Sequence, residues 1–324
     1  MPSDHRWPRA SDWLADGPGE RPADLVVLGV PASATSLSET RAHETPAAIR
    51  AALARFGTYA AARGADLFGL APLDLGDLPD PDADEDATAA AAAAAVAQAR
   101  LLVALGGDNS LTYAVMRGAV TDLPTAGLVT LDAHHDLRDG VSNGSPVRRL
   151  VEAGLDPHRV VQVGIADFVN SRAYTERARD WGITVVTRQA LEGRAMATVM
   201  AEAIDLAGAG GGDVYVDLDV DVCDRAVAPA CPASAPGGIS ALALRDAAYA
   251  AGADPRVRAV DVTEVDAAAD TPDGRTVRLV ALCLLEAAAG LTARPAARPG
   301  GTPGGAAGRA VEPRQPLGSR PCAP

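Results

Sequence analysis

The sequence contains no lysine, and all 29 of its basic residues are arginines. The absence of lysine excludes Schiff-base chemistry, a pyridoxal-phosphate lysine and the lysine of a nucleotide-binding P-loop. Only 3% of the residues are aromatic, so alanine, valine and leucine must fill most of the interior. The four cysteines include no CxxC pair, which argues against a disulfide scaffold and a zinc ribbon.

Positive charge and long apolar runs are also scarce. The formal net charge is -13 and the pI is about 4.8, which argues against nucleic acid or an anionic membrane as a partner. The chain has no run of about 18 apolar residues, the length that a transmembrane helix requires. The polar N-terminus lacks the apolar core of a signal peptide. We therefore expect a cytoplasmic protein in a reducing compartment.

Short runs rich in valine, leucine and isoleucine recur along the 324 residues. They lie at 24–30, 101–105, 127–131, 160–165, 183–187, 214–218 and 259–262, with a weaker one at 73–75. Alanine-rich segments that predict helices lie between them, for example at 46–54, 87–99, 242–251 and 276–289. Most of the strand candidates are apolar throughout rather than alternating, which indicates burial on both faces. The pattern predicts an open, mainly parallel α/β sheet.

The composition divides the chain into three parts. We expect residues 1–22 to form an N-terminal extension and residues 23–293 to form one catalytic domain. Residues 294–324 are rich in proline, glycine, alanine and arginine and show no apolar periodicity, which is typical of a disordered tail. Within the domain, residues 79–86 (PDPDADED) predict an acidic loop.

Charged residues gather where four predicted strands end. GGDNS follows the run at 101–105, DAHHD follows the run at 127–131, DLDVD overlaps the end of 214–218, and TEVD follows 259–262. The carboxyl ends of parallel strands share one edge of the sheet, where ligands bind. Several carboxylates buried together would repel one another, and their pKa values would rise. The cluster therefore needs a source of positive charge.

Metal cations are the stronger explanation, because no arginine lies among the clustered positions except Arg138, which follows DAHHD. Oxygen-rich sites with an occasional imidazole suit manganese, magnesium or iron. The i, i+2 spacing of DxHxD and DxD places the ligands on one face of an extended chain. An isolated DxD is common in surface loops. Two such motifs after two strands, however, predict a pair of ions that activates a water molecule.

These motifs resemble the three signatures of the ureohydrolases, the family of arginase, agmatinase and formimidoylglutamase. The matching segments are GGDNS (106–110), DAHHD (132–136) and DVDVCDRAVAPACPASAPGG (219–238), within a resemblance that runs from about residue 28 to 285. The resemblance implies a three-layer α/β/α fold around a mainly parallel eight-stranded sheet. It also implies a centre of two Mn²⁺ ions that hydrolyses a linear amidine or guanidine C–N bond. A homo-oligomer acting on a small molecule is expected.

The resemblance also assigns ligands by position. Asp132 and Asp219 would bridge both ions. Asn109 and Asp136 would complete the site of the first ion. His134 and Asp221 would complete the site of the second.

Two of the aligned carboxyl groups would take part in catalysis. Asp136 would carry a proton to the leaving nitrogen, and Glu264 would pair with the cationic amidine or guanidine. One residue departs from the usual pattern, because most relatives have histidine where this chain has Asn109. A neutral amide oxygen is a weaker ligand than imidazole for a first-row transition metal, so the first ion should bind more loosely. Some bacterial formimidoylglutamases resemble this chain in having GGDNS.

Three further stretches resemble formimidoylglutamases: NGSPVRR (143–149), GIADFVNS (164–171) and GVPAS (29–33) with its continuation. Formimidoylglutamate carries two carboxylates, which guanidinium groups bind well. Ala166 stands where these relatives have arginine, which leaves one expected anion contact without its residue. The candidates for substrate binding are Asn143, Ser145, Arg148 and Arg41, with Arg149 as a further cation.

We therefore expect a Mn²⁺-dependent hydrolase that converts N-formimidoyl-L-glutamate and water to L-glutamate and formamide, a step of histidine degradation. One alternative is an agmatinase or another guanidino-acid ureohydrolase. Another is a catalytically weak family member that serves as a binding protein, and its support is the pair of departures at Asn109 and Ala166. A zinc deacetylase is a further alternative, but the only tandem histidines, His134 and His135, lie inside the metal motif.

Overall fold

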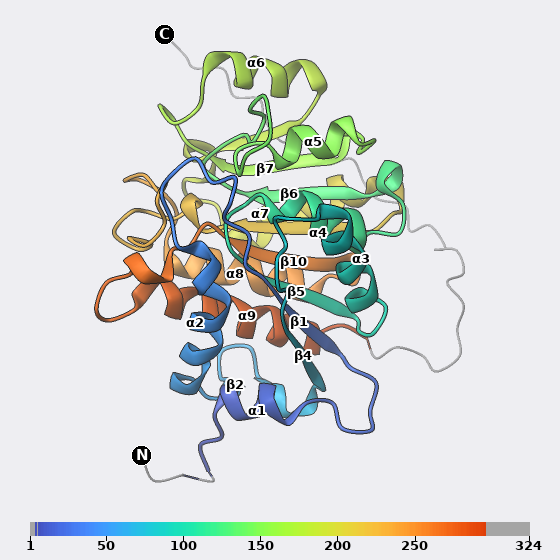
Figure 1. Ribbon diagram of the computed structural model, residues 1–324, viewed down its shortest axis with the longest axis vertical. Helices are drawn as coiled ribbons and strands as arrows, with labels where there is room; N and C mark the ends of the chain where they lie inside the picture. The colour runs from blue at the N-terminus through green and yellow to red at the C-terminus, as the bar shows by residue number, and fades with distance from the viewer. Residues whose placement is uncertain (1–3, 5, 296–324) are drawn as a thin grey trace.

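The computed structural model describes residue 4 and residues 6–295 of the chain. An eight-stranded sheet runs through it in the order β4-β1-β5-β10-β9-β6-β7-β8 (Figure 1). Each pair of neighbours in this sheet is parallel. The predicted parallel α/β sheet is therefore confirmed.

The strands lie close to the predicted apolar runs. In the large sheet they are β1 (Leu25–Val30), β4 (Pro72–Asp77), β5 (Leu101–Gly106), β6 (Gly127–Leu131), β7 (Val160–Ile165), β8 (Thr184–Thr187), β9 (Val214–Asp219) and β10 (Val257–Thr263). A separate antiparallel pair consists of β2 (Tyr59–Ala60) and β3 (Ala65–Asp66). The weakest sequence signal, at 73–75, is a full strand, β4, at the edge of the sheet.

Helices connect the parallel strands, as crossovers between such strands require. The connecting helices are α2 (Thr45–Ala52), α3 (Glu85–Val96), α4 (Leu111–Ala119), α5 (Pro146–Glu152), α6 (Arg172–Trp181), α7 (Met196–Ala207) and α8 (Ala241–Ala253). Helix α1 (Ala10–Asp16) precedes β1, and α9 (Arg275–Thr292) follows β10. No helix in the described part of the chain is long and apolar enough to cross a membrane.

Strand side chains alternate between two separate cores, one on each face of the sheet. In β1, Leu25 and Val27 pack in the core that α1, α2, α7, α8 and α9 cover. Val26 and Leu28 pack in the core that α3, α4, α5 and α6 cover. Every residue of β1 is buried, which explains why its sequence is apolar throughout. The result is the expected three-layer α/β/α arrangement (Figure 1).

The packed body extends beyond both ends of the predicted domain. Trp13 and Leu14 of α1, within the expected N-terminal extension, are 3% and 4% exposed and belong to the first core. Arg294, the first residue of the predicted tail, is buried and donates hydrogen bonds to the carbonyl oxygens of Gly252 (2.6 Å) and Val257 (3.0 Å). The remainder of the predicted tail, from residue 296, and residues 1–3 and 5 of the extension lie outside the described residues.

Helix α3 begins two residues before the predicted segment at 87–99. The Asp84 carboxylate accepts hydrogen bonds from the backbone N–H groups of Asp86 (3.0 Å) and Ala87 (2.9 Å). These bonds satisfy backbone donors that a helix start leaves free, so Asp84 serves as the N-cap. The acidic stretch 79–86 is therefore only partly a loop, because its last two residues form the first turn of α3.

A glycine after β5 allows two loops to meet beside the carboxyl edge of the sheet. A Cβ atom on Gly107 would lie 2.1 Å from the carbonyl oxygen of Ala32, so only glycine permits this approach. The Gly107 carbonyl accepts a hydrogen bond from the backbone N–H of Glu264 at 3.0 Å. The glycine pair of GGDNS thus holds the loops after β1, β5 and β10 together.

Candidate metal centre and substrate cavity

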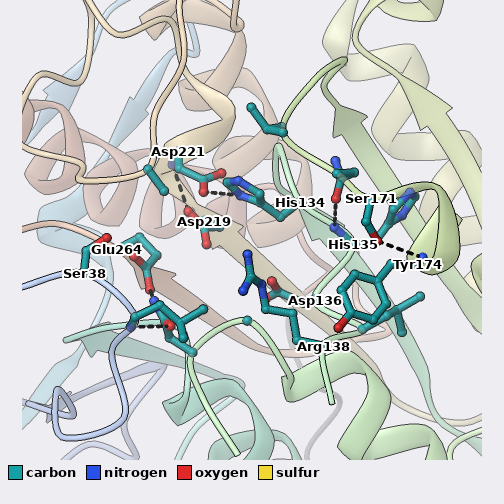
Figure 2. A pocket seen from close by; sticks show the side chains of 17 residues that line it. Ser38, His134, His135, Asp136, Arg138, Ser171, Tyr174, Asp219, Asp221 and Glu264 are labelled. Carbon is teal, nitrogen blue, oxygen red and sulfur yellow. Dashed lines mark hydrogen bonds and ion pairs between the residues drawn. The ribbon is translucent and has the colours of Figure 1, made fainter. Parts of the chain in front are cut away.

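Side chains from several strand ends meet at the carboxyl edge of the sheet (Figure 2). They line a cavity of about 190 Å³, to which the loop after β1 contributes Leu37 and Ser38. The acidic side chains that line it are Asp136 after β6, Asp219 and Asp221 at the end of β9, and Glu264 after β10. The convergence expected from the sequence is therefore present in the fold.

One group of side chains at this edge has the spacing of a metal site. His134 Nδ1 lies 2.6 Å from Oδ2 of Asp221 and 3.5 Å from Oδ1 of Asp132. One ligand atom from each of the three residues lies within 4.8 Å of the others. Among the described residues, Oδ2 of Asp132 is buried without a hydrogen-bond partner. A buried orphan oxygen beside two carboxylates and an imidazole fits a divalent cation such as Mn²⁺.

A proton on His134 balances part of this negative charge. Burial disfavours a charged imidazole, but the carboxylates of Asp221 and Asp132 outweigh it and raise the pKa of His134 to about 12. Burial also acts to raise the pKa of Asp221, yet His134 lowers it overall. Burial and the neighbouring Asp221 raise the pKa of Asp132 to about 7. A bound cation would replace the His134 proton as the partner of these two carboxylates.

We expect Mn²⁺ binding to release protons and to strengthen as the pH rises from 6.5 to 8. His134 must lose its proton to become a ligand, and Asp132 must be ionised. Linkage gives about a tenfold gain in affinity per pH unit for each proton released. Calorimetric titration of the full chain with Mn²⁺ in buffers of different ionisation enthalpy would count those protons. An affinity independent of pH would contradict this assignment.

The remaining predicted ligands lie beside this group. Asp219 Oδ1 accepts a hydrogen bond from the backbone N–H of Asp221 at 2.8 Å, and Asp136 Oδ2 accepts one from Asn109 Nδ2 at 2.5 Å. Burial and nearby carboxylates, first Asp132 for Asp136 and Asp221 for Asp219, raise both pKa values well above the ordinary range. Asp136 also has a positive φ of 53°, which is uncommon for a residue with a side chain.

Glu264 forms one wall of the cavity and is fixed by two neighbours. Its Oε1 accepts hydrogen bonds from the Asn109 backbone N–H (2.8 Å) and from Asn143 Nδ2 (2.7 Å). Burial, with a contribution from Asp108, raises the pKa of Glu264 to about 8. Asn143 Oδ1 accepts in turn from the backbone N–H of Leu37 at 3.1 Å. Asn143 thus lines the cavity, and it also connects Glu264 to the loop after β1.

The structure does not bring the other predicted substrate-binding residues to the cavity wall. Ser145 is fully buried, and its hydroxyl donates to the Ser142 carbonyl at 2.8 Å. Arg41 is exposed and pairs with Glu44. Arg148 donates through Nε to the Arg138 carbonyl at 2.6 Å and pairs with Glu152.

Two further residues singled out in the sequence also lie away from this cavity. Arg149 forms a double hydrogen bond with Glu85, at 2.7 and 2.6 Å, and its guanidinium lies over the Tyr113 ring. Ala166 lines a separate cavity of about 240 Å³, with Arg188 among its other walls.

Arg138, which sequence reasoning passed over as a substrate residue, lines the cavity. Figure 2 shows its side chain extending into the site. Within the described residues its guanidinium makes no hydrogen bond or ion pair, and Arg138 donates only through its backbone N–H, to the Gly144 carbonyl at 3.0 Å. Tyr174, Asn170 and Ser38 also line the cavity. Its place in the sequence could have indicated this role, because Arg138 lies two residues after Asp136 in the same loop.

Comparison with known proteins shows similarity along nearly the whole predicted domain. Residues 23–290 match the arginase family model. The formimidoylglutamase of Halalkalibacterium halodurans is 33% identical over 265 residues, which cover 78% of this chain and 82% of that protein. The crystal structure of formimidoylglutamase from Bacillus subtilis aligns with a TM-score of 0.83 at 28% identity, over 91% of this chain and 95% of that chain. The crystal structure of Trypanosoma cruzi formiminoglutamase with Mn²⁺ aligns with a TM-score of 0.80 at 22% identity, over 89% of this chain and 100% of that chain.

Proposed function

This chain belongs to the arginase family, and we propose that it is a formimidoylglutamase that uses two Mn²⁺ ions. In this reaction, water attacks the amidine carbon of N-formimidoyl-L-glutamate, and the bond from that carbon to the glutamate nitrogen breaks. The products are formamide and L-glutamate. The similar proteins that are named formimidoylglutamases support N-formimidoyl-L-glutamate as the substrate. The charged groups in the cavity support a substrate that carries both an amidine and a carboxylate.

The observation that carries the proposal is the pairing of opposite charges around one cavity. Glu264 supplies a carboxyl group, whose ionised form a cationic amidine would stabilise, and Arg138 supplies a guanidinium with no protein partner among the described residues. A substrate with a cationic amidine and a carboxylate complements both groups, because guanidinium binds carboxylate through two parallel hydrogen bonds. Agmatine, a cation without a carboxylate, would leave Arg138 unpaired.

The side chains at the expected ligand positions support the binding of two metal ions. The residues that would hold the ions are Asn109, Asp132, His134, Asp136, Asp219 and Asp221. Carboxylates, an imidazole and an amide oxygen suit Mn²⁺, and such a pair of cations supplies a water molecule acidic enough to react near neutral pH. Three of these residues, Asp132, His134 and Asp221, have ligand atoms within 4.8 Å of one another.

The remaining chemistry belongs to protein side chains. Glu264 binds the amidinium and orients its carbon, and Asn143 holds the Glu264 carboxylate in place. Asp136 takes a proton from the attacking water and delivers it to the nitrogen that becomes the amine of glutamate. Leu37 and Ser38 of the loop after β1 form part of the cavity wall.

Replacing Arg138 by glutamine should raise the KM for N-formimidoyl-L-glutamate about 10- to 100-fold, because a charge-assisted hydrogen bond contributes about 1.5–3 kcal/mol. The kcat should change far less, since Arg138 contacts a part of the substrate that does not react. Steady-state formamide release measures both constants.

Arg41→Gln is the matched control for Arg138→Gln. Arg41 is exposed and pairs with Glu44, so this variant should keep the wild-type KM. An amidine without carboxylates, such as N-propylformamidine, should react equally with wild type and Arg138→Gln. An unchanged KM for the glutamate substrate in Arg138→Gln would remove Arg138 from the binding site.

A further inference from the structure

Behind Asn109 lies a buried group of hydroxyl and carboxylate side chains that the proposed reaction does not use. The hydroxyl of Thr112, in the first turn of α4, is 2.7 Å from Asn109 Oδ1 and 2.7 Å from Asp261 Oδ2. The Tyr215 hydroxyl donates to the same Asp261 oxygen at 2.6 Å. Asn109 is 1% exposed, and Thr112, Tyr215 and Asp261 are each 0% exposed. These contacts are therefore shielded from water.

A second hydroxyl lies in an equivalent position. Thr263 Oγ1 is 3.3 Å from Asn109 Oδ1 and 3.5 Å from Asp217 Oδ1. Both Thr112 and Thr263 thus lie between the Asn109 amide and a buried carboxylate. The other end of this amide, Nδ2, donates to Asp136 Oδ2, one of the expected metal ligands.

Each threonine hydroxyl has one hydrogen to donate. Two hydroxyls converge on Asp261 Oδ2, as expected for an ionised carboxylate oxygen that only accepts, and such charge-assisted bonds are stronger than bonds to an amide. When Thr112 donates to Asp261, its oxygen can only accept, so Asn109 must present Nδ2 to it. Nδ2 has two hydrogens, which match the two hydroxyl oxygens of Thr112 and Thr263. The amide oxygen then faces Asp136.

The two ends of an amide have nearly the same shape, so this exchange requires only a rotation of the side-chain amide. In the structure, Nδ2 donates a hydrogen bond to Asp136 Oδ2. A cation beside Asp136 requires the oxygen instead, because an amide N–H₂ group has no lone pair to offer a metal. The orientation of Asn109 is therefore coupled to the direction in which Thr112 donates.

We propose that Asp261, acting through Thr112, is a positioning residue that turns the oxygen of Asn109 toward the first metal ion. The inference rests on the proposed role of Asn109 as a ligand. It adds the protein groups that allow an asparagine to act at this position. Groups behind a metal ligand commonly change metal affinity 10- to 100-fold when they are replaced.

The test is a titration of the purified full chain with Mn²⁺, in which electron paramagnetic resonance of the free ion gives the number and affinity of the sites. Wild type should bind two ions. Thr112→Val, which has nearly the same shape but no hydroxyl, should weaken one of the two sites about 10- to 100-fold and leave the other unchanged. Thr112→Ser keeps the hydroxyl and should restore the affinity. A merely structural role for Thr112 would not separate the two sites.

Two further variants complete the test. Thr130→Val is the matched control, since Thr130 is also fully buried but its hydroxyl has no partner among the described residues; both sites should keep their affinity. Asp261→Asn should weaken the same site as Thr112→Val, because an amide at position 261 can donate to Thr112 and so reverse the direction of its hydrogen bond. This variant carries the test if Thr112→Val does not fold.

Two outcomes would overturn the inference. Wild-type affinity at both sites in Thr112→Val and Asp261→Asn would show that these residues do not position Asn109. Binding of a single ion by wild type, unaffected by Asn109→Ala, would show that Asn109 is not a ligand, and the inference would fail together with that premise. The second outcome would leave formimidoylglutamase activity itself open to direct assay, so the two failures are distinguishable.

Discussion

Asp219→Ala should lose metal binding and catalysis together. Asp219 lies at the end of β9, is 2% exposed, and occupies the position of a carboxylate that would contact both ions. Removing it takes a negative charge from each proposed site. Since metal ions supply several kcal/mol of transition-state stabilisation, kcat/KM should fall by about 10³-fold or more.

Thermal unfolding gives a second readout of the same variant. Ligands that bind only the folded state raise its stability, so Mn²⁺ should raise the melting temperature of wild type and have little effect on Asp219→Ala. Without metal, the variant should be folded, because Asp219 is one of several buried carboxylates that repel one another. Asp273→Ala, an exposed carboxylate paired with Arg275, serves as the control. If Asp219→Ala retained activity and the Mn²⁺-induced shift, Asp219 would not be a shared ligand.

Glu264→Gln should abolish turnover and leave metal binding intact. The substitution keeps an oxygen that accepts from the Asn109 N–H and from Asn143 Nδ2, so the local structure should persist. It removes the negative charge that pairs with the amidinium. Loss of one partner from a buried ion pair costs about 3–5 kcal/mol, which corresponds to a decrease of about 10²- to 10⁴-fold in kcat/KM.

Mn²⁺ titration alongside kinetics separates this result from that of Asp219→Ala. The glutamine variant should bind two ions with near wild-type affinity, because Glu264 is not one of the proposed ligands. Glu44→Gln, a half-exposed carboxylate that pairs with Arg41, should leave both activity and metal binding unchanged. Full turnover by Glu264→Gln would exclude Glu264 from substrate binding.

The convergence of the acidic motifs could be predicted because it depends on local sequence and one topological rule. Apolar runs such as LVVLGV (25–30) identify strands that are buried on both faces, and parallel strands place their carboxyl ends together. Residues at the carboxyl ends of such strands, including Asp132 directly after β6 and Asp219 at the end of β9, could therefore be assigned to one edge. The family resemblance then supplied their proposed roles.

The arginines could not be assigned in the same way. A guanidinium reaches several ångströms from its backbone, so its partner depends on the three-dimensional position of distant residues. Arg148 contacts the Arg138 carbonyl, and Arg149 contacts Glu85, which is 64 positions away in the chain. Each of these contacts removes an apparent substrate ligand from the cavity. Arg138 remains in the cavity, although its sequence context resembles that of any charged loop residue.

The composition of the two end segments also did not predict that some of their side chains pack against the folded domain. The segment 1–22 reads as polar, yet Trp13 is buried against the core. Arg294 begins a stretch of low-complexity sequence, but its guanidinium satisfies carbonyl oxygens at the ends of other elements. At each end of the chain, one side chain anchors the segment to the folded domain. The average composition of a segment does not indicate such a contact.

The central claim is that this chain releases formamide from N-formimidoyl-L-glutamate in a Mn²⁺-dependent reaction. The most direct test incubates the purified protein with Mn²⁺ and compares formamide release from that substrate with urea release from agmatine, arginine and guanidinobutyrate. We predict formamide release that a chelator abolishes and Mn²⁺ restores, with little urea from the three guanidines. Urea release from one of them in place of formamide, or no turnover of any substrate at saturating Mn²⁺, would contradict the proposed function.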